Sequence, residues 1–284
     1  MSDDLKGAFE SAAVELDEGG RAYHVLSIED IHEIARSSGI SPGEASARAL
    51  EAGFLPLRYR KNVGTTGLDG QAKLLRSRVV VVGAGGIGGN ACELLARMGI
   101  GSLLLVDPDV FEESNLNRQN FSAEDTLGLP KVEVVRDRLS TINCDVNIEV
   151  HRLAAGPENL GGLLAGADAA IDGLDNFYDR VQLQAACREA GVVMVHGAIA
   201  GSSLQLMTIF PGDAGLESLV DPGTREEKAR GIEVETGNPA TTPALVAALQ
   251  VSEALKVILG LGEPIRGRMF YMDLSDLSAE FFEV

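Results

Sequence analysis

The sequence has little cysteine: three cysteines occur in 284 residues, and no two of them form a C-x-x-C pair. A structural zinc site built from thiolates needs closely spaced cysteines, so we expect no zinc in this protein. Cys92 and Cys187 stand in apolar, helix-like stretches, where a cysteine usually behaves as a small hydrophobic residue. We therefore expect both of these thiols to be buried.

Long hydrophobic runs are missing as well. No apolar stretch approaches the length of a membrane span, which takes about 20 residues. The acidic opening Met1-Ser2-Asp3-Asp4 does not have the pattern of a signal peptide. We expect a cytoplasmic protein that is not associated with a membrane.

Positive charge is scarce, because 24 Lys and Arg stand against 42 Asp and Glu, for a formal net charge of -18. A surface of this sign repels the phosphates of nucleic acids, which argues against a general nucleic-acid partner. The chain is long enough for one large domain or two smaller ones with a buried core.

A glycine-rich turn between two apolar runs is the most informative feature that is present. Val79–Val82 leads into Gly83-Ala84-Gly85-Gly86-Ile87-Gly88, and the run Ser102–Val106 ends on Asp107. This order is typical of a Rossmann-type nucleotide site. In that pattern Gly83 allows the tight turn, Gly85 lets backbone amides approach a phosphate, and Gly88 lets the helix pack closely on the sheet. Asp107 is placed to bind ribose hydroxyls, and the helix N-terminus favours anionic oxygens.

The hydrophobic pattern from about residue 74 onward is that of alternating strands and helices. It predicts strands over 78–82, 102–106, 146–151, 168–172 and 192–195. It predicts helices near 87–98, 130–142, 158–165 and 177–190. This alternation indicates a Rossmann-like, doubly wound α/β fold with a mostly parallel sheet.

The pattern changes after residue 200. We expect a strand over 204–210, a long apolar helix over 241–260 and two antiparallel C-terminal strands at 268–273 and 279–284. The segment 211–240 is rich in Gly, Pro, Asp and Glu and shows little periodicity. Because structureless loops of this length are usually lids or disordered, it is either a mobile loop over the site or a floppy insertion.

The first 56 residues are predicted to form a small N-terminal helical extension, separate from a nucleotide-binding domain over 57–284. Residues 1–26 form an acidic lead-in without a clear element. Ser27 and Ser41 are placed to cap helices over 28–38 and 42–52. Acids outnumber bases in this helix pair, which argues against a helix-turn-helix that reads DNA. We expect an appendage packed on the main domain or on a partner.

Polar and basic residues follow Asp107 closely. The segment 107–119 contains Asp109, Asn115, Arg118 and Gln119, and Lys131 opens the next predicted helix. A dinucleotide site needs no such cations, whereas a triphosphate needs donors and positive charge. The segment therefore favours a triphosphate nucleotide.

A second acid follows the strand predicted at 168–172. Asp175 and Asn176 stand directly before the next helix, and ligands of open α/β sheets bind at the carboxyl ends of strands. A carboxylate facing a polyphosphate is repelled unless a cation lies between them, and Mg²⁺ is the natural bridge. Asp175 also suits the helix cap, and both roles can hold together.

The combined motifs resemble those of the MoeB/ThiF/HesA group, the bacterial relatives of ubiquitin-activating enzymes. The resemblance covers residues 58–284. The motifs are Arg58-Tyr59-Arg60-Lys61-Asn62, Gly70-Gln71, the glycine turn, Asp107-x-Asp109, Ser114-Asn115-Leu116-Asn117-Arg118-Gln119, Gly128-x-Pro130-Lys131, Leu174-Asp175-Asn176 and the helix around Gln250. Residues 57–284 are thus expected to form a ThiF-type, ATP-binding adenylation domain.

The resemblance implies an activity and its cofactors. Members of the group bind ATP with Mg²⁺ and adenylylate the C-terminal carboxylate of a small ubiquitin-like or sulfur-carrier protein that ends in Gly-Gly, releasing pyrophosphate. It implies that Asp107 holds the ribose, that Arg118 and Lys131 neutralise phosphates and that Asp175 positions Mg²⁺. The remaining cofactor-binding candidates are Gly83, Gly85, Gly86, Gly88, Asp109, Asn115, Gln119 and Asn176.

The resemblance also implies a homodimer, in which a basic residue of the Arg-Tyr segment reaches the partner's site. Lys61 stands where the group usually has arginine; it keeps the charge but loses the bidentate fork, so Arg60 is the alternative. The cysteine pairs that bind zinc in the group are absent, and so is a cysteine in 211–240. A thioester step through a protein cysteine is therefore not expected.

Other functions stay open at this point. An NAD(P)-dependent oxidoreductase shares the glycine turn and the acid, but it does not need Arg118, Lys131 or Asp175. An inactive or partner-dependent adenylation subunit agrees with Lys61 and with the missing cysteines. A peptide or a modified tRNA base is an alternative acceptor to a carrier protein, and the sequence does not identify which of the three is used.

Overall fold

The computed structural model describes residues 3–219 and 236–284. Its centre is an eight-stranded sheet in the order β11-β10-β9-β8-β7-β4-β5-β6. Five neighbouring strands are parallel: β4 (Arg78–Val82), β5 (Ser102–Val106), β6 (Asn147–His151), β7 (Ala169–Asp172) and β8 (Val193–Ala200). Taken in chain order these five lie as 5-4-1-2-3, the doubly wound arrangement that the sequence predicts.

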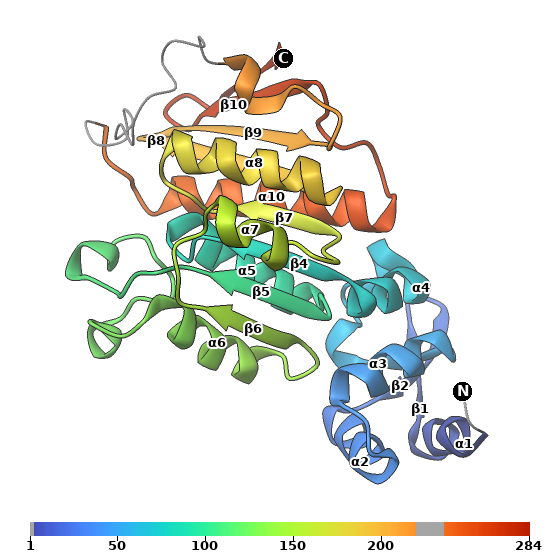
Figure 1. Ribbon diagram of the computed structural model, residues 1–284. Coiled ribbons are helices and arrows are strands. Elements are labelled where there is room, and N and C mark those ends of the chain that lie inside the picture. The colour runs from blue at the N-terminus through green and yellow to red at the C-terminus, as the bar shows by residue number, and fades with distance from the viewer. Residues whose placement is uncertain (1–2, 220–235) are drawn as a thin grey trace.

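Helices cover both faces of this sheet (Figure 1). One face carries α5 (Gly86–Met98), α6 (Lys131–Ile142) and α10 (Thr241–Leu259), and the other carries α7 (Pro157–Leu163) and α8 (Phe177–Ala190). All five helices lie where the hydrophobic pattern places them, within two residues at each end. The period of the apolar residues is therefore enough to identify them.

The antiparallel part of the sheet is formed by the C-terminal third of the chain. β9 (Ser203–Ile209) pairs with β8, β10 (Arg268–Asp273) with β9, and β11 (Ser278–Glu283) with β10. The prediction of antiparallel C-terminal strands is confirmed. β8 is longer than predicted, because its second half pairs with β9 as far as Ala200 opposite Ser203.

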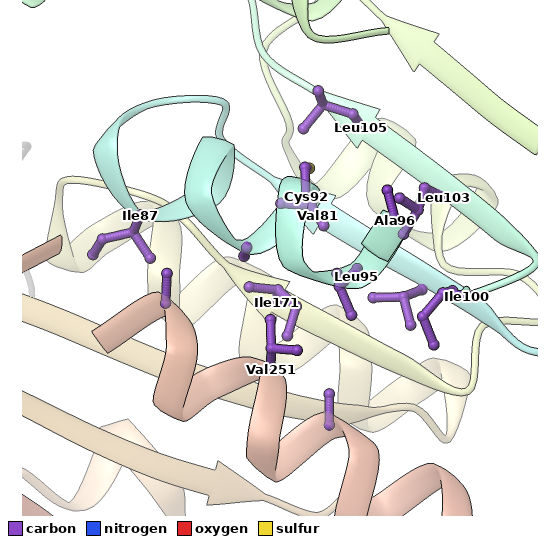
Figure 2. Close-up of a cluster of buried hydrophobic side chains, with 14 of the residues drawn as sticks. Val81, Ile87, Cys92, Leu95, Ala96, Ile100, Leu103, Leu105, Ile171 and Val251 are labelled. Carbon is purple, nitrogen blue, oxygen red and sulfur yellow. The ribbon is translucent and has the colours of Figure 1, made fainter. Parts of the chain in front are cut away.

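Two apolar layers enclose the sheet. Figure 2 shows part of the larger one, in which Cys92 and Leu95 of α5 share a cluster with Val81 and Ile171 of the strands and Val251 of α10. α10 is long and apolar enough to cross a membrane by length and composition, and half of its most apolar window is buried inside the protein. The helix packs in this core, as expected for a helix whose residues are mostly apolar.

The N-terminal segment contains more regular structure than the sequence predicts. The predicted helices α2 (Ile28–Ser38) and α3 (Pro42–Glu51) are present, with Ser27 and Ser41 as their N-caps. The acidic lead-in, for which no element is predicted, forms α1 (Asp3–Ala12) and the antiparallel strands β1 (Val14–Glu18) and β2 (Arg21–Leu26). β3 (Phe54–Pro56) completes a three-stranded sheet beside β2. α4 (Val63–Arg76), also not predicted, connects to the large sheet.

The Arg-Tyr motif fastens this N-terminal segment to the sheet. Tyr59 is fully buried, and its hydroxyl donates to Asp145 Oδ2 at 2.9 Å and accepts from Asn143 Nδ2 at 3.0 Å. The Arg58 guanidinium pairs with Asp145 and donates to Asn143 Oδ1. Gln71 is buried too and donates to the Met98 carbonyl at 2.8 Å. These motif residues therefore hold the segment at the loop after α6 and at the end of α5.

Candidate functional site

A pocket of about 640 Å³ opens where β4, β5 and β7 end. Val82 is in register with Val106 and with Asp172, so the three strands finish at one level. This is the point where the strand order reverses, with β4 between β5 and β7, and such points form the ligand crevice of open α/β sheets. The volume suits a ligand of nucleotide size.

The glycine turn forms the floor of the pocket. Gly83 has a φ of 98° and donates its N–H to the Val106 carbonyl at 2.8 Å. A Cβ on Gly88 would overlap the Gly83 carbonyl oxygen, so the helix can pack this closely only with glycine there. Gly85 and Gly86 line the pocket at the start of α5. The free N–H groups of that helix end suit an anionic ligand.

Asp107 lies at the end of β5 beside the turn. Its side chain is buried, and its two carboxylate oxygens accept from the backbone N–H of Ala84 at 2.6 Å and of Asp109 at 2.8 Å. Each carboxylate oxygen has a second lone pair, so the group can still accept from a ligand hydroxyl. The structure thus places Asp107, the residue predicted to bind the ribose, in the pocket with its carboxylate already oriented.

The two predicted phosphate ligands line one wall of the pocket. Lys131 is largely buried and its Nζ lies 3.1 Å from Asp109 Oδ2. Arg118 donates through Nη1 to the Ser114 carbonyl at 3.0 Å and to Asn117 Oδ1 at 2.8 Å. Both cations are held by the protein before a ligand arrives, which lowers the cost of ordering them on binding.

Two of the three predicted amide ligands, Gln119 and Asn115, are placed differently from each other. Gln119 lines the pocket near Gly85; its side chain is buried, and its Oε1 has no hydrogen-bond partner among the residues that the structure describes. A buried amide oxygen without a partner is costly, so it points to a ligand or water group that completes it. Asn115 does not line the pocket. Its Oδ1 accepts from the Glu112 N–H at 3.0 Å and shapes the loop that presents Arg118.

Asp175 stands on the opposite wall, in the loop between β7 and α8. Its side chain is exposed to the pocket, and its one hydrogen bond among the described residues is a long one, from Asn176 Nδ2 at 3.4 Å. The helix cap is Asn176, whose Oδ1 accepts from the Asp179 N–H at 2.9 Å. The expectation that Asp175 caps this helix is therefore wrong, and its carboxylate is left for the pocket.

A buried polar cluster below this loop is not predicted from the sequence. Asp172 is fully buried, and its Oδ2 lies 2.6 Å from His196 Nδ1 and 3.5 Å from Arg180 Nε. Arg180 also lines the pocket. Burial lowers the pKa of His196 more strongly than the nearby Asp172 raises it. The only sequence signal is Asp172 at the end of an otherwise apolar strand.

The remaining predicted residues lie elsewhere. Neither Arg60 nor Lys61 is among the residues that line the pocket of this chain. The predicted loop over the site, 211–240, lies mostly outside the described residues, but its last part reaches the pocket through Asn238. The Asn238 carbonyl accepts from Asn117 Nδ2 at 3.0 Å, next to Arg118.

The charges of the pocket suit a polyanion with a bridging cation. Arg118, Lys131 and Arg180 contribute positive charge, and Asp107, Asp109 and Asp175 face the same space. Among the described residues no group of three or more His, Cys, Asp or Glu is placed to hold a metal by itself. One or two carboxylates together with ligand phosphates are the usual site of Mg²⁺, so the pocket fits a metal that arrives with a nucleotide.

Both predicted structural cysteines are buried. Cys92 is 0% exposed and Cys187 2% exposed, and burial raises the pKa of each thiol to about 12. The prediction that they behave as small hydrophobic residues is confirmed. The expectation of no zinc stays a prediction.

Comparison with known proteins agrees with this geometry. The ThiF family model matches residues 59–284. The SAMP-activating enzyme E1 of Haloferax volcanii is 37% identical over 229 residues, covering 78% of this chain and 83% of that protein. The molybdopterin-synthase adenylyltransferase of Escherichia coli is 36% identical over 225 residues, covering 76% of this chain and 88% of that protein.

A solved structure shows the same fold. The crystal structure of E. coli MccB with ATP matches with a TM-score of 0.68 at 22% identity, over 80% of this chain and 71% of that one. At this identity the likeness supports the architecture and not the choice of substrate.

Proposed function

The chain belongs to the ThiF family, and from this premise we propose that it is an adenylyltransferase that activates the C-terminal carboxylate of a small ubiquitin-like or sulfur-carrier protein. The observation that carries the proposal is the pocket itself. It places Arg118 and Lys131 on one wall and Asp175 on the other, around a glycine turn at the start of a helix. A hydride-transfer site needs the turn but not this set of charges.

ATP is the nucleotide that this pocket suits. The glycine turn and the N-terminus of α5 offer backbone donors to phosphates, and Asp107 offers an acceptor to the ribose. Arg118 and Lys131 offset the charge of the triphosphate. The unpartnered Oε1 of Gln119 adds an acceptor inside the same wall.

Asp175 is the residue proposed to hold Mg²⁺. When bound with the nucleotide, Mg²⁺ supplies positive charge that offsets the phosphate oxygens as the α-phosphorus is attacked. The side chain of Asp175 fits this role because it is exposed in the pocket and is not used as a helix cap. Asn176 holds the adjoining helix turn and so keeps Asp175 in place.

The proposed reaction needs no protein nucleophile. A carboxylate oxygen of the acceptor attacks the α-phosphorus, a C–O–P linkage forms, and the bond from the α-phosphorus to the bridging oxygen breaks. Pyrophosphate takes the electron pair and leaves. The protein contributes by positioning the two anions and by stabilising the charge on the phosphate oxygens.

The homodimer is also a proposal. Lys61 does not line the pocket of its own chain, which agrees with a role in the site of a second copy. We propose residues 57–284 as the adenylation domain, with residues 1–56 as an extension. The cytoplasmic location stays a prediction.

The test is ATP–pyrophosphate exchange with Mg²⁺ and purified small proteins ending in Gly-Gly from the same organism. We expect exchange that depends on one of them. ATP binding without exchange would point to a peptide acceptor or an inactive partner subunit. Binding of NAD without binding of ATP would overturn the proposal in favour of an oxidoreductase.

A further inference from the structure

The buried cluster of Asp172, His196 and Arg180 lies directly beneath the loop that carries Asp175. Asp172 ends β7, His196 is on the neighbouring strand β8, and Arg180 is in the first turns of α8. All three side chains project to the α8 face of the sheet, because Asp172 Oδ2 is within 3.5 Å of both partners. They are therefore one unit assembled from three elements.

The hydrogen bonds of this unit converge on Leu174, the residue before Asp175. The Leu174 N–H donates to Asp172 Oδ1 at 2.9 Å, and the Leu174 carbonyl accepts from Arg180 Nη2 at 2.6 Å. Both backbone groups of one loop residue are thus tied to the same buried ion pair. The position of the next residue, Asp175, follows from that of Leu174.

Asp172 is itself held from both faces of the sheet. His196 Nδ1 lies 2.6 Å from its carboxylate on one face. From the other face, Gln250 of α10 donates through Nε2 to the Asp172 carbonyl at 2.9 Å and to the Val195 carbonyl at 3.0 Å. The end of β7 therefore has little freedom to shift when a ligand enters the pocket.

An ion pair at this depth is not explained by stability alone. Asp172 is 0% exposed and the Arg180 side chain 13% exposed, and burying such a pair usually costs more than well-packed apolar side chains of similar volume. Arg180 Nε and His196 Nε2 are buried without a hydrogen-bond partner within the described residues. A costly arrangement whose bonds end on a loop of the site suggests that the loop is what it serves.

We propose that Asp172, His196 and Arg180 are positioning residues that set the place of Asp175 in the pocket. The inference rests on the proposed function, because Asp175 is the carboxylate assigned to the metal there. The cluster meets the pocket through Arg180, whereas Asp172 and His196 are buried and do not line it. It acts through the backbone of Leu174, with Arg180 and Asp172 holding the two sides of that residue.

Two conservative variants test the proposal. Arg180→Lys keeps the charge but cannot hold Asp172 and the Leu174 carbonyl with one planar fork. Asp172→Asn keeps the shape but removes the counter-charge of Arg180. Arg188→Gln is the matched control, since Arg188 lies on the same helix and pairs with Glu217 at the surface.

The measurements separate positioning from folding. One is the affinity for Mn²⁺, read by electron paramagnetic resonance with the non-hydrolysable analogue α,β-methylene ATP. Another is hydrogen exchange at the Leu174 amide, and thermal unfolding is followed alongside. We expect Arg180→Lys and Asp172→Asn to speed exchange at Leu174 and to weaken Mn²⁺ binding about 10-fold, as for a lost hydrogen bond to a charged group.

Turnover supplies a further readout. The assay uses an acceptor that is active with the wild-type protein. Relative to wild type, we expect kcat to fall by about 100-fold in both variants, the effect of misplacing a group by about 1 Å. The KM for the acceptor should stay within about twofold, and Arg188→Gln should match wild type in every measurement.

The outcomes keep this inference apart from the proposed function. Normal Mn²⁺ affinity and normal kcat in both variants, with faster exchange at Leu174, would show a merely structural cluster and overturn the inference. If the wild-type protein shows no acceptor-dependent ATP–pyrophosphate exchange, this result would count against the proposed function. The Mn²⁺ affinities of the variants would still decide the role of the cluster. Wild type that binds neither ATP nor Mn²⁺ would overturn both.

Discussion

Asp107 Oδ2 accepts a hydrogen bond of 2.6 Å from the backbone N–H of Ala84, which ties the end of β5 to the glycine turn after β4. Asp107, the residue proposed to bind the ribose, therefore also holds the glycine turn in shape. One carboxylate links the two halves of the proposed nucleotide site, so its replacement would disturb both.

Replacement of Asp175 by asparagine should remove activity without unfolding the protein. The side chain is exposed and has a single long contact, from Asn176 at 3.4 Å. We expect ATP–pyrophosphate exchange to fall by about 10²–10³-fold, the size of losing one electrostatic contact in a reacting site. Exposed Asp276, in the turn between β10 and β11, provides the control Asp276→Asn. Exchange near the wild-type rate in Asp175→Asn would remove this residue from the mechanism.

Replacement of Arg118 or Lys131 by alanine should weaken the response to ATP. Both line the pocket, and both are already oriented by protein acceptors. We expect kcat/KM for ATP to fall by about 10²-fold or more in each variant. The control is Arg97→Ala, because Arg97 pairs with Glu93 on the surface of α5. Unchanged ATP kinetics in either variant would place the triphosphate elsewhere.

Replacement of Gly88 by alanine should destabilise the domain. The added Cβ would overlap the Gly83 carbonyl oxygen, so α5 must move away from the sheet. We expect a loss of about 3 kcal/mol or more in the free energy of unfolding. Gly161→Ala, at an exposed position of α7 where an added Cβ meets open space, should instead stabilise by up to about 1 kcal/mol. Urea unfolding of both variants measures the difference, and equal stabilities would contradict the packing described.

Acidification should destabilise the protein partly through His196. Burial lowers the pKa of His196 in the folded state below its ordinary value of 6.5. Between those two pKa values the unfolded chain binds the proton and the folded protein does not. The contribution of neutral His196 to the free energy of unfolding is therefore fully present above pH 6.5. It is lost as the pH falls below 6.5, by up to about 1.4 kcal/mol per pH unit.

The variant His196→Gln isolates this contribution. The free energy of unfolding is measured for both proteins between pH 7.5 and 5.5. We expect wild type to lose more stability than the variant over this range. Parallel curves would mean that His196 does not titrate below its ordinary value in the folded protein.

Thiol labelling should distinguish the three cysteines. Cys92 and Cys187 are buried with a raised pKa, whereas Cys144 is exposed, with its Sγ 3.0 Å from His32 Nε2. We expect one thiol to react with a disulfide reagent in the native protein at pH 8 and three to react in denaturant. Cys144→Ser should abolish the native reaction. Burial raises the pKa of Cys144 too, so labelling should be slower than for free cysteine.

The period of the apolar residues was enough to predict most of the fold. The helices α5, α6, α8 and α10 and seven of the eight strands of the large sheet lie close to the predicted ranges, and β8 extends five residues beyond its predicted end. The N-terminal strands were missed because β1, VELDE, is short and contains only two apolar residues, so that its strand depends on pairing with β2. α4 was missed because three of its fourteen residues are glycines, which weaken a helical pattern.

The site was predicted where residues follow a strand end and was missed where they lie within the core. Asp107 and Asp175 were found because strand ends meet at one edge of the sheet, and Lys131 because it opens the predicted helix that follows the polar segment 107–119. Arg180 and His196 carry no signal in the sequence, since a single arginine or histidine in a helix or strand has many ordinary uses. Asn115 was assigned to the pocket from its position in a loop, but its side chain turns back onto the Glu112 backbone.

The sequence alone determined the nucleotide turn and the order of strands and helices, because glycine spacing and hydrophobic period are local properties. Only the tertiary structure decided which side chains face one another across the pocket. Residues 172, 180 and 196 come from three elements, and their ion pair exists only once α8 packs on β7 and β8. Contacts between distant segments depend on the packing of the whole sheet, and no local pattern in the chain encodes them.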